Sequence, residues 1–224
     1  MTSLQAQAEE FFNAGRNAAA EVHTLPLAET LVAKAIECDG SVSAYYQLQC
    51  DILRCLRQLN KAIEAGEQAV NLARQDAEAW YLLALACSDA GRCGDAAAHY
   101  QQALHFNPRH DKAANNLGAV LEAEGKLSEA EACYARAVEF NPRNAEAQNN
   151  LGAILSTRGD LDRARQCFIA AVDINPLFVH AHYNLSTLKK YTVNDPHLVA
   201  LEKLAVNAHN LSADVQLRLW FSLG

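Results

Sequence analysis

Residues 77–110 read AEAWYLLALACSDAGRCGDAAAHYQQALHFNPRH, and residues 111–144, which follow without a gap, read DKAANNLGAVLEAEGKLSEAEACYARAVEFNPRN. Each stretch has 34 residues, and the two share glycine at position 15, alanine at positions 20 and 27, tyrosine at position 24 and Asn-Pro at positions 31 and 32. A period of 34 residues is typical of chains built from stacked helical hairpins. The shared residues therefore predict that each stretch folds into two antiparallel helices.

The same register extends in both directions and divides most of the chain into frames. The five frames are Glu9–Val42, Ser43–Asp76, Ala77–His110, Asp111–Asn144 and Ala145–Phe178. Alanine recurs in all five frames, at position 20 as Ala28, Ala62, Ala96, Ala130 and Ala164, and at position 27 as Ala35, Ala69, Ala103, Ala137 and Ala171. Positions seven residues apart share one face of a helix. We expect this face of each second helix to pack closely against its neighbours.

Turn residues stand where a helical hairpin needs them. Gly91, Gly125 and Gly159 at position 15 can adopt the left-handed conformation that ends a helix. An Asn-Pro pair follows each second helix, at 107–108, 141–142 and 175–176. Because proline is tolerated in the first turn of a helix, each pair predicts the start of the next hairpin.

Eight residues at fixed spacing within residues 77–110 carry a resemblance to a known family. They are Trp80, Leu83, Ala84, Gly91, Ala96, Tyr100, Ala103 and Pro108. They resemble the tetratricopeptide repeat (TPR) family, and the resemblance extends over about residues 9–212. It implies an all-α fold, a right-handed superhelical solenoid of antiparallel helix pairs with about six repeats and a partial one. The family's large residue at position 4 is replaced by Ala114, Gln148 and His182, which predicts looser packing there.

We expect three regions along the chain. Residues 1–42 are a degenerate N-terminal capping repeat, and residues 179–224 are an atypical repeat with the truncated start of another. Between them lies the core of residues 43–178, divided into the repeats 43–76, 77–110, 111–144 and 145–178. Because half a repeat cannot cover its own apolar face, we expect the chain to be part of a longer protein. Residues 180–224 resemble bacterial proteins that join TPR repeats to a C-terminal sulfotransferase-like domain.

Composition and charge limit the classes of partner that the chain is expected to bind. The chain is 50% apolar and 20% charged, as expected of a folded protein with a core. Its net charge of −7 disfavours binding to nucleic acid. The N-terminus has no signal-peptide pattern and no apolar run is long enough to span a membrane, which predicts a cytoplasmic location. The seven cysteines include no CxxC pair, and we expect them to be small core residues.

The resemblance implies that the first helices line a concave face, with positions 2, 5 and 6 pointing into it. Position 6 holds Asn116, Asn150 and Asn184, which we call the asparagine row. The row is flanked by Tyr81, Asn115, Asn149 and Tyr183 at position 5 and by Lys112 and Glu146 at position 2. An amide carries both donors and an acceptor, so it can pair with the main chain of an extended peptide. The sequence thus predicts a scaffold that binds a polypeptide partner, unless these asparagines are ordinary surface residues.

Catalytic and metal sites are disfavoured by the same residues. His180 and His182 lie two apart, so on a helix they do not share a face. Glycine-rich phosphate loops, paired catalytic carboxylates and zinc spacings do not occur, and we expect no enzyme activity, no cofactor and no metal in this chain.

Two alternative functions remain open. One is self-assembly into a homo-oligomer through an apolar terminal helix that carries Leu217, Trp220, Phe221 and Leu223. The other is a substrate-recruiting N-terminal part of a larger sulfotransferase or glycosyltransferase. The asparagine row defined above is similar to the asparagine ladder in the repeat domain of one such glycosyltransferase, the O-linked N-acetylglucosamine transferase.

Overall fold

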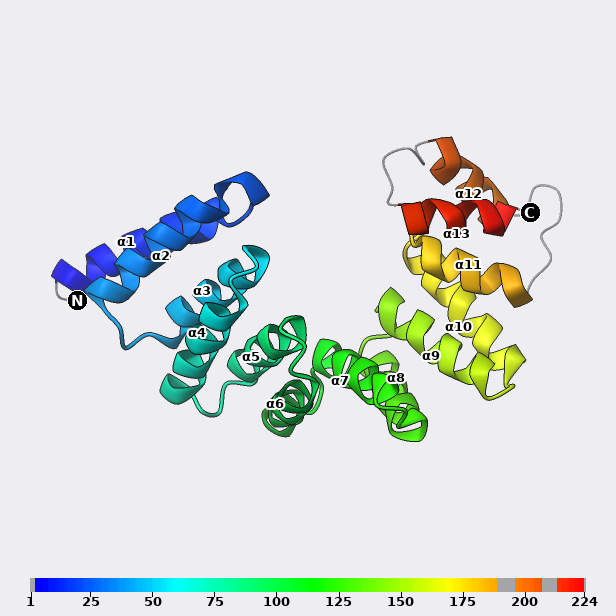
Figure 1. The fold of residues 1–224 in the computed structure, drawn as a ribbon, viewed down its shortest axis with the longest axis horizontal. Helices are drawn as coiled ribbons and strands as arrows, with labels where there is room; N and C mark the ends of the chain where they lie inside the picture. The colour runs from blue at the N-terminus through cyan, green and yellow to red at the C-terminus, as the bar shows by residue number, and fades with distance from the viewer. Residues whose placement is uncertain (1–2, 189–195, 207–212, 224) are drawn as a thin grey trace. The chain divides into compact units, whose positions relative to one another are not determined.

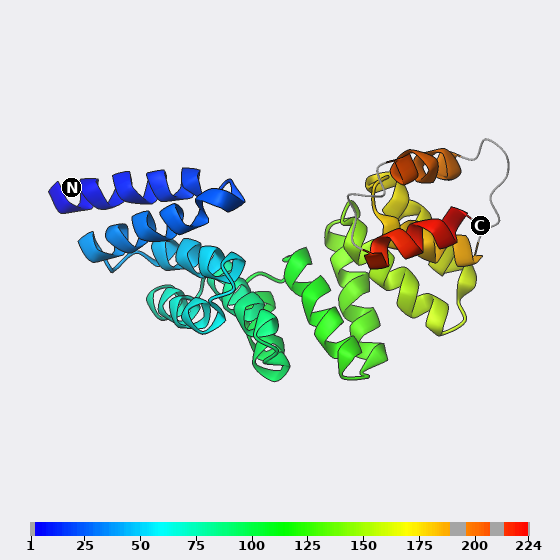
Figure 2. The same ribbon diagram turned by 45° about the horizontal axis from the view of Figure 1, so that its top comes forward.

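The computed structural model of the chain describes residues 3–188, 196–206 and 213–223, and at 213–215 and 222–223 the backbone alone. Every regular element in these residues is a helix, so the predicted all-α fold class is confirmed. Figures 1 and 2 show neighbouring helices lying side by side as hairpins, α1 with α2, α3 with α4, α5 with α6 and α9 with α10. The predicted helical hairpin is thus the repeating element of the structure.

The helices follow the predicted register closely. Their bounds are α1 Ser3–Ala18, α2 Leu25–Cys38, α3 Ser43–Cys55, α4 Leu59–Leu72, α5 Ala77–Asp89, α6 Cys93–Phe106, α7 Asp111–Ala123, α8 Leu127–Phe140, α9 Ala145–Thr157, α10 Leu161–Ile174, α11 Val179–Leu188, α12 Pro196–Val206 and α13 Ala213–Leu223, with a short 3-10 turn η1 at Val22–Thr24. Four of them, α3, α5, α7 and α9, begin at the first residue of a frame. The first hairpin differs, because α1 already begins at Ser3.

The chain forms two compact units, Met1–Ala113 and Ala114–Gly224. The first unit holds the helices α1 to α6 and the first residues of α7. The second unit holds the rest of α7 and the helices that follow it. The asparagine row lies wholly in the second unit.

The alanines that define the register are core residues. All ten alanines at positions 20 and 27 are at most 1% exposed. Because alanine adds only a methyl group to the backbone, each second helix can approach its neighbours closely at these two points. The prediction of a tightly packed helix face is confirmed.

Glycine at position 8 receives an aromatic ring from position 24 of the same hairpin. A Cβ atom added at Gly118 would lie 2.7 Å from Cε1 of Tyr134, and one added at Gly152 would lie 2.7 Å from Cε1 of Phe168. Both rings are at most 2% exposed. The second frame reverses the sizes, with Cys50 at position 8 and Gly66 at position 24. There the space above Gly66 is filled by Leu83 of α5 instead.

The turns at position 15 take the conformation that the glycines predict. Gly91, Gly125 and Gly159 have φ angles of 75°, 77° and 86°. Arg57 occupies the same position in the second frame and has a φ of 59°, the only positive value among the described residues that are not glycine. The hairpin therefore imposes the left-handed turn even where the side chain disfavours it.

Two expectations were wrong in part. Position 4 is not loosely packed, because Gln148 is 9% exposed and His182 is fully buried. Each donates a side-chain N–H to a proline carbonyl six residues earlier, Gln148 Nε2 to Pro142 at 3.3 Å and His182 Nε2 to Pro176 at 3.0 Å. The cysteines are not all core residues either. Cys50 and Cys87 are buried, whereas Cys55 and Cys93 are exposed.

Candidate peptide-binding site

The asparagines of positions 5 and 6 form one hydrogen-bonded network across three first helices. Asn184 of α11 donates its Nδ2–H to Oδ1 of Asn149 on α9, at 2.9 Å. Asn150 of α9 donates in the same way to Asn115 on α7, at 3.1 Å. Within each helix the bond is longer, 3.4 Å from Asn149 to Asn150 and 3.3 Å from Asn115 to Asn116. We call these five residues the asparagine network.

Repeat geometry explains why these side chains meet. Both bonds between helices join residues 35 apart, so position 6 of one frame reaches position 5 of the frame before it. The next positions along the same helices turn inward, where Leu117 and Leu151 at position 7 are 5% and 6% exposed. The core thus fixes the orientation of each first helix, and this orientation brings the amides of successive repeats together.

The four bonds of the network form one head-to-tail series. It runs from Asn184 through Asn149, Asn150 and Asn115 to Asn116, and each amide donates an N–H to the oxygen of the next. An asparagine amide has two N–H donors and two oxygen lone pairs. In these bonds Asn150 uses one donor and one lone pair, which leaves one of each for another partner. The network therefore holds the amides in place and still leaves hydrogen-bonding groups for a ligand.

Burial separates the network into two groups. Asn115 and Asn149 are only 5% and 8% exposed, so they offer little surface to a ligand. The asparagine row, in contrast, is only partly buried. The two residues of position 5 thus act mainly as bridges that hold the row.

The remaining predicted residues lie in different surroundings. Glu146 and Lys112 are exposed. Tyr183 is partly buried, and its ring contacts Phe221 with 5.5 Å between centroids. Tyr81 belongs to the first unit, where its ring packs against His110 at 4.6 Å and it is 9% exposed. The structure therefore brings the five asparagines together, with Tyr183 next to them, but it keeps Tyr81 as a largely buried packing residue of another unit.

Sequence reasoning missed two features of this region. The bonds between positions 5 and 6 could have been foreseen from the consecutive asparagines at 115–116 and 149–150. The contact of α13 with Tyr183 could not, because residues 189–195 and 207–212 interrupt the register before that helix. In the structure Leu217, Arg218 and Phe221 of α13 line a pocket with Tyr183.

One charged residue of α7, Glu122, has a structural role. Glu122 of α7 accepts a hydrogen bond from the hydroxyl of Tyr134 at 2.8 Å. Burial and this carboxylate raise the pKa of Tyr134, so the hydroxyl stays protonated. Among the residues that the structure describes, no three His, Cys, Asp or Glu side chains gather as metal ligands would. The helices described here also include none that is long and apolar enough to cross a bilayer.

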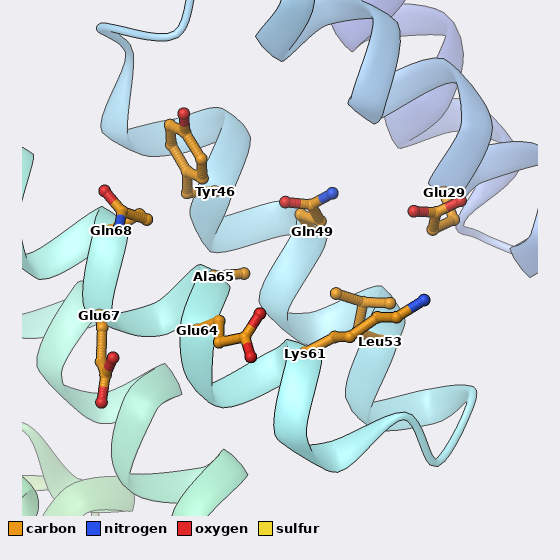
Figure 3. Close-up of a pocket in the computed structure, with 9 residues that line it drawn as sticks. All are labelled: Glu29, Tyr46, Gln49, Leu53, Lys61, Glu64, Ala65, Glu67 and Gln68. Carbon is orange, nitrogen blue, oxygen red and sulfur yellow. The ribbon is translucent and has the colours of Figure 1, made fainter.

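A second hollow lies in the first unit, between α2, α3 and α4, and has a volume of about 500 Å³. Figure 3 shows its lining, with Glu29 from α2, Tyr46 and Gln49 from α3, and Lys61 and Glu64 among the residues of α4. Gln49 stands at position 7, where the later frames have a buried leucine. The hollow therefore marks a place where a core position has become polar. Of its charged lining residues, Glu29 is partly buried and those of α4 are exposed.

Solved structures show the same fold at low sequence identity. PilW, a widely conserved type IV pilus biogenesis factor, matches with a TM-score of 0.76 and 19% identity over 95% of this chain and 98% of its own. PilF of Pseudomonas aeruginosa matches with a TM-score of 0.71 and 14% identity over 99% and 92%. YrrB, a TPR protein with an unusual peptide-binding site, matches with a TM-score of 0.60 and 22% identity over 80% and 95%. No curated protein matches in sequence.

Sequence profiles identify the repeat. Two profiles of the tetratricopeptide repeat match, over residues 53–110 and 109–176, and together they cover more than half of the 224 residues. Neither reaches residues 180–224, so the resemblance of that tail to sulfotransferase-linked proteins stays a prediction. The chain therefore belongs to the tetratricopeptide repeat family.

Proposed function

We propose that this protein holds an extended segment of another polypeptide by its main chain. In this proposal Asn116, Asn150 and Asn184 contact the ligand, and Asn115 and Asn149 hold them in place. The observation that supports it is the head-to-tail hydrogen-bonded network that links all five amides. A fixed amide loses little conformational freedom on binding, so the network lowers the entropic cost of recognition.

The spacing of the helices suits an extended peptide. Packed helices lie about 8–10 Å apart, and an extended chain rises about 3.3 Å per residue. Successive members of the row would therefore meet the ligand about every three residues. Each keeps at least one N–H and one lone pair outside the network, which match one C=O and one N–H of the peptide main chain.

Residues beside the row would sample the side chains of the ligand. Glu146 is exposed on α9, and Tyr183 presents part of its ring beside Asn184. Main-chain pairing by amides is independent of the ligand's sequence, so these flanking residues would supply what preference there is. Tyr81 and Lys112 belong to the first unit and are not part of this proposed site. The peptide-binding site named for YrrB agrees with such a role for the fold.

The test is to compare binding before and after removal of the row. A screen of random, acetylated and amidated 12-residue peptides would find a binder, and fluorescence anisotropy would measure its affinity for wild type and for the triple variant Asn116→Ala, Asn150→Ala, Asn184→Ala. Each lost hydrogen bond is worth about 0.5–1.5 kcal/mol, so affinity should fall at least about tenfold.

A matched variant controls for helix propensity. Asn60 and Asn71 are exposed asparagines of α4, so Asn60→Ala together with Asn71→Ala makes the same chemical change away from the row. This control should bind like wild type, and all proteins should keep the same helical circular dichroism. Equal affinities of the triple variant and wild type would show that the row is ordinary surface.

Self-assembly is a second candidate that one observation favours. On α13 the side chains of Leu217, Trp220 and Phe221 are 69%, 54% and 66% exposed. Apolar side chains grouped on one short helix often mark an interface. Sedimentation velocity over a hundredfold range of protein concentration would detect it, and a constant monomer would exclude it.

A further inference from the structure

Helix α13 places three side chains beside Tyr183 of α11. The guanidinium of Arg218 lies over the Tyr183 ring, 5.3 Å from its centroid, and the ring of Phe221 lies 5.5 Å from it. Together with Leu217 they line a pocket of about 230 Å³. This is smaller than the roughly 300–1,000 Å³ typical of sites for whole small molecules, and it suits a single side chain.

The helix is docked by a different face. Leu219 is fully buried and packs with Val179 of α11 and Leu201 of α12. Helix α13 thus docks onto α12 through Leu201, whereas Trp220 remains 54% exposed. Because Leu219 holds the helix, the neighbouring Leu217 and Phe221 can stay open to solvent while the pocket keeps its shape.

The pocket lies directly beside the asparagine network. Tyr183 precedes Asn184, and Asn184 is the last donor of the network. A chain that follows the row past α11 would therefore reach α13 next. One helix spacing of about 8–10 Å corresponds to about three residues of extended peptide.

We propose that this pocket is an anchor site for one bulky apolar side chain of the bound peptide, with an adjacent carboxylate that pairs with Arg218. The proposal rests on the proposed function and adds to it a preference for particular side chains of the ligand. The anchor residue lies about three residues from the residue that pairs with Asn184. The ligand class is thus an extended acidic-apolar segment, and the pocket is what distinguishes it from other peptides.

Charge and geometry favour this occupant. Tyr183, Leu217 and Phe221 offer apolar walls, and among the lining residues that the structure describes Arg218 is the charged one. Stacking over an aromatic ring uses the face of a guanidinium, whereas binding a carboxylate uses its edge. A guanidinium has five N–H donors, so a carboxylate of the ligand can bind Arg218 in addition to the contacts that it makes within the chain.

The experiment uses four synthetic dodecapeptides with a common Ser/Thr host sequence. Three are acetylated and amidated and carry Leu-Glu, Leu-Gln or Ala-Glu at the centre. The fourth ends in leucine with a free carboxylate, which tests whether the acid must come from a side chain. Anisotropy titrations with wild type should show that Leu-Glu binds about tenfold tighter than Leu-Gln or Ala-Glu.

Two pocket variants and two controls identify the source of that preference. Arg218→Gln should remove the preference for Glu over Gln, and Phe221→Ala should remove the preference for Leu over Ala. Trp220→Ala on the same helix and Leu177→Ala, which is 69% exposed in the turn before α11, should leave both preferences unchanged. The emission of Trp220 in the pocket variants confirms that α13 stays docked.

The outcomes separate this inference from the proposed function. Binding that depends on the asparagine row but shows no preference among the four peptides overturns the anchor site alone. A preference that persists in both pocket variants also overturns it. A preference lost in the pocket variants but unaffected by replacing the row supports the anchor and overturns the proposed function. If none of the peptides binds wild type, both fail, and a dimer that Phe221→Ala dissociates would identify a second copy as the occupant.

Discussion

Glycine and the aromatic ring that crosses it act as one unit at the scale of single residues. Gly152 lies under Phe168 so closely that even a methyl group would come within 2.7 Å of the ring. The ring is 2% exposed and is surrounded by packed helices, so it has little room to move away. Gly94, in contrast, lies on the exposed start of α6, where an added methyl group meets nothing within 4 Å.

These two glycines predict opposite effects of the same substitution. Gly152→Ala should lower the free energy of unfolding by about 1–3 kcal/mol, because the added methyl overpacks the crossing. Gly94→Ala should raise it by about 0.4–1 kcal/mol, because alanine restricts the unfolded chain and favours the helix. Urea denaturation followed by circular dichroism measures both. A Gly152→Ala protein as stable as wild type would contradict the role given to this crossing.

At Arg57 the backbone adopts a conformation that residues with a side chain disfavour. Its φ of 59° matches the turns that Gly91, Gly125 and Gly159 make at the same position. A left-handed conformation costs an ordinary residue about 1–2 kcal/mol, part of which glycine loses again through its freer unfolded chain. We therefore expect Arg57→Gly to stabilise the protein by up to about 1 kcal/mol in urea denaturation. A loss of stability would mean that the Arg57 side chain contributes more than the strain removes.

At the scale of helices, one bond recurs between three of the first helices and the turn before each of them. Trp80, Gln148 and His182 all stand at position 4, and each donates a side-chain N–H to the carbonyl six residues earlier. Three different side chains thus tie the start of α5, α9 and α11 to the preceding turn. The bond satisfies a turn carbonyl that the helix ladder does not reach.

His182 makes this bond sensitive to pH. Burial, with the nearby His197, lowers the pKa of His182 below its ordinary value of 6.5. As the pH falls, the unfolded chain then takes up a proton more readily than the folded one, so stability falls. The loss should begin near the unfolded pKa of about 6.5 and level off below the folded pKa.

His182→Gln isolates this effect, because Gln148 makes the same bond at the equivalent position of the preceding repeat. The variant should match wild type at neutral pH to within about 1 kcal/mol and exceed it increasingly as the pH drops below about 6.5. Urea denaturation at several pH values tests this. Other titrating groups, including His99 and Glu78, are common to both proteins and cancel in the difference. Parallel pH profiles would contradict the burial of a neutral imidazole.

The repeat could be predicted from sequence because its determinants are local and periodic. The alanines of positions 20 and 27 fixed the register, and α3, α5, α7 and α9 begin where that register places them. The side-chain bonds at position 4 could not be foreseen. Gln148 and His182 differ from the large residue that the family has there, yet each still places a side-chain N–H donor at the same point. The network did leave a signal, the consecutive asparagines at 115–116 and 149–150. Its bonds join position 6 of one repeat to position 5 of the repeat before, so only a comparison between neighbouring repeats would have revealed them.

At the scale of the whole molecule, the two tryptophans divide between the two compact units. Trp80 lies in the unit Met1–Ala113 and Trp220 in the unit Ala114–Gly224. In solenoid proteins each repeat contacts its neighbours, so a local perturbation is felt most strongly nearby. The stabilising Arg57→Gly belongs to the first unit and the destabilising Gly152→Ala to the second. The chain thus offers one reporter and one perturbation in each unit.

We expect each perturbation to act mainly on the reporter of its own unit. In a Trp220→Phe background, where Trp80 alone is observed, Arg57→Gly should raise the urea midpoint and Gly152→Ala should change it little. In a Trp80→Phe background the sensitivities should reverse, because Trp220 then reports on the second unit. The loss of the Trp80 hydrogen bond in that background is common to every protein compared and cancels. Nearest-neighbour coupling alone predicts this pattern, since unfolding can begin in one part of a solenoid and spread. Equal shifts of both reporters in every variant would show instead that all the repeats unfold as a single cooperative unit.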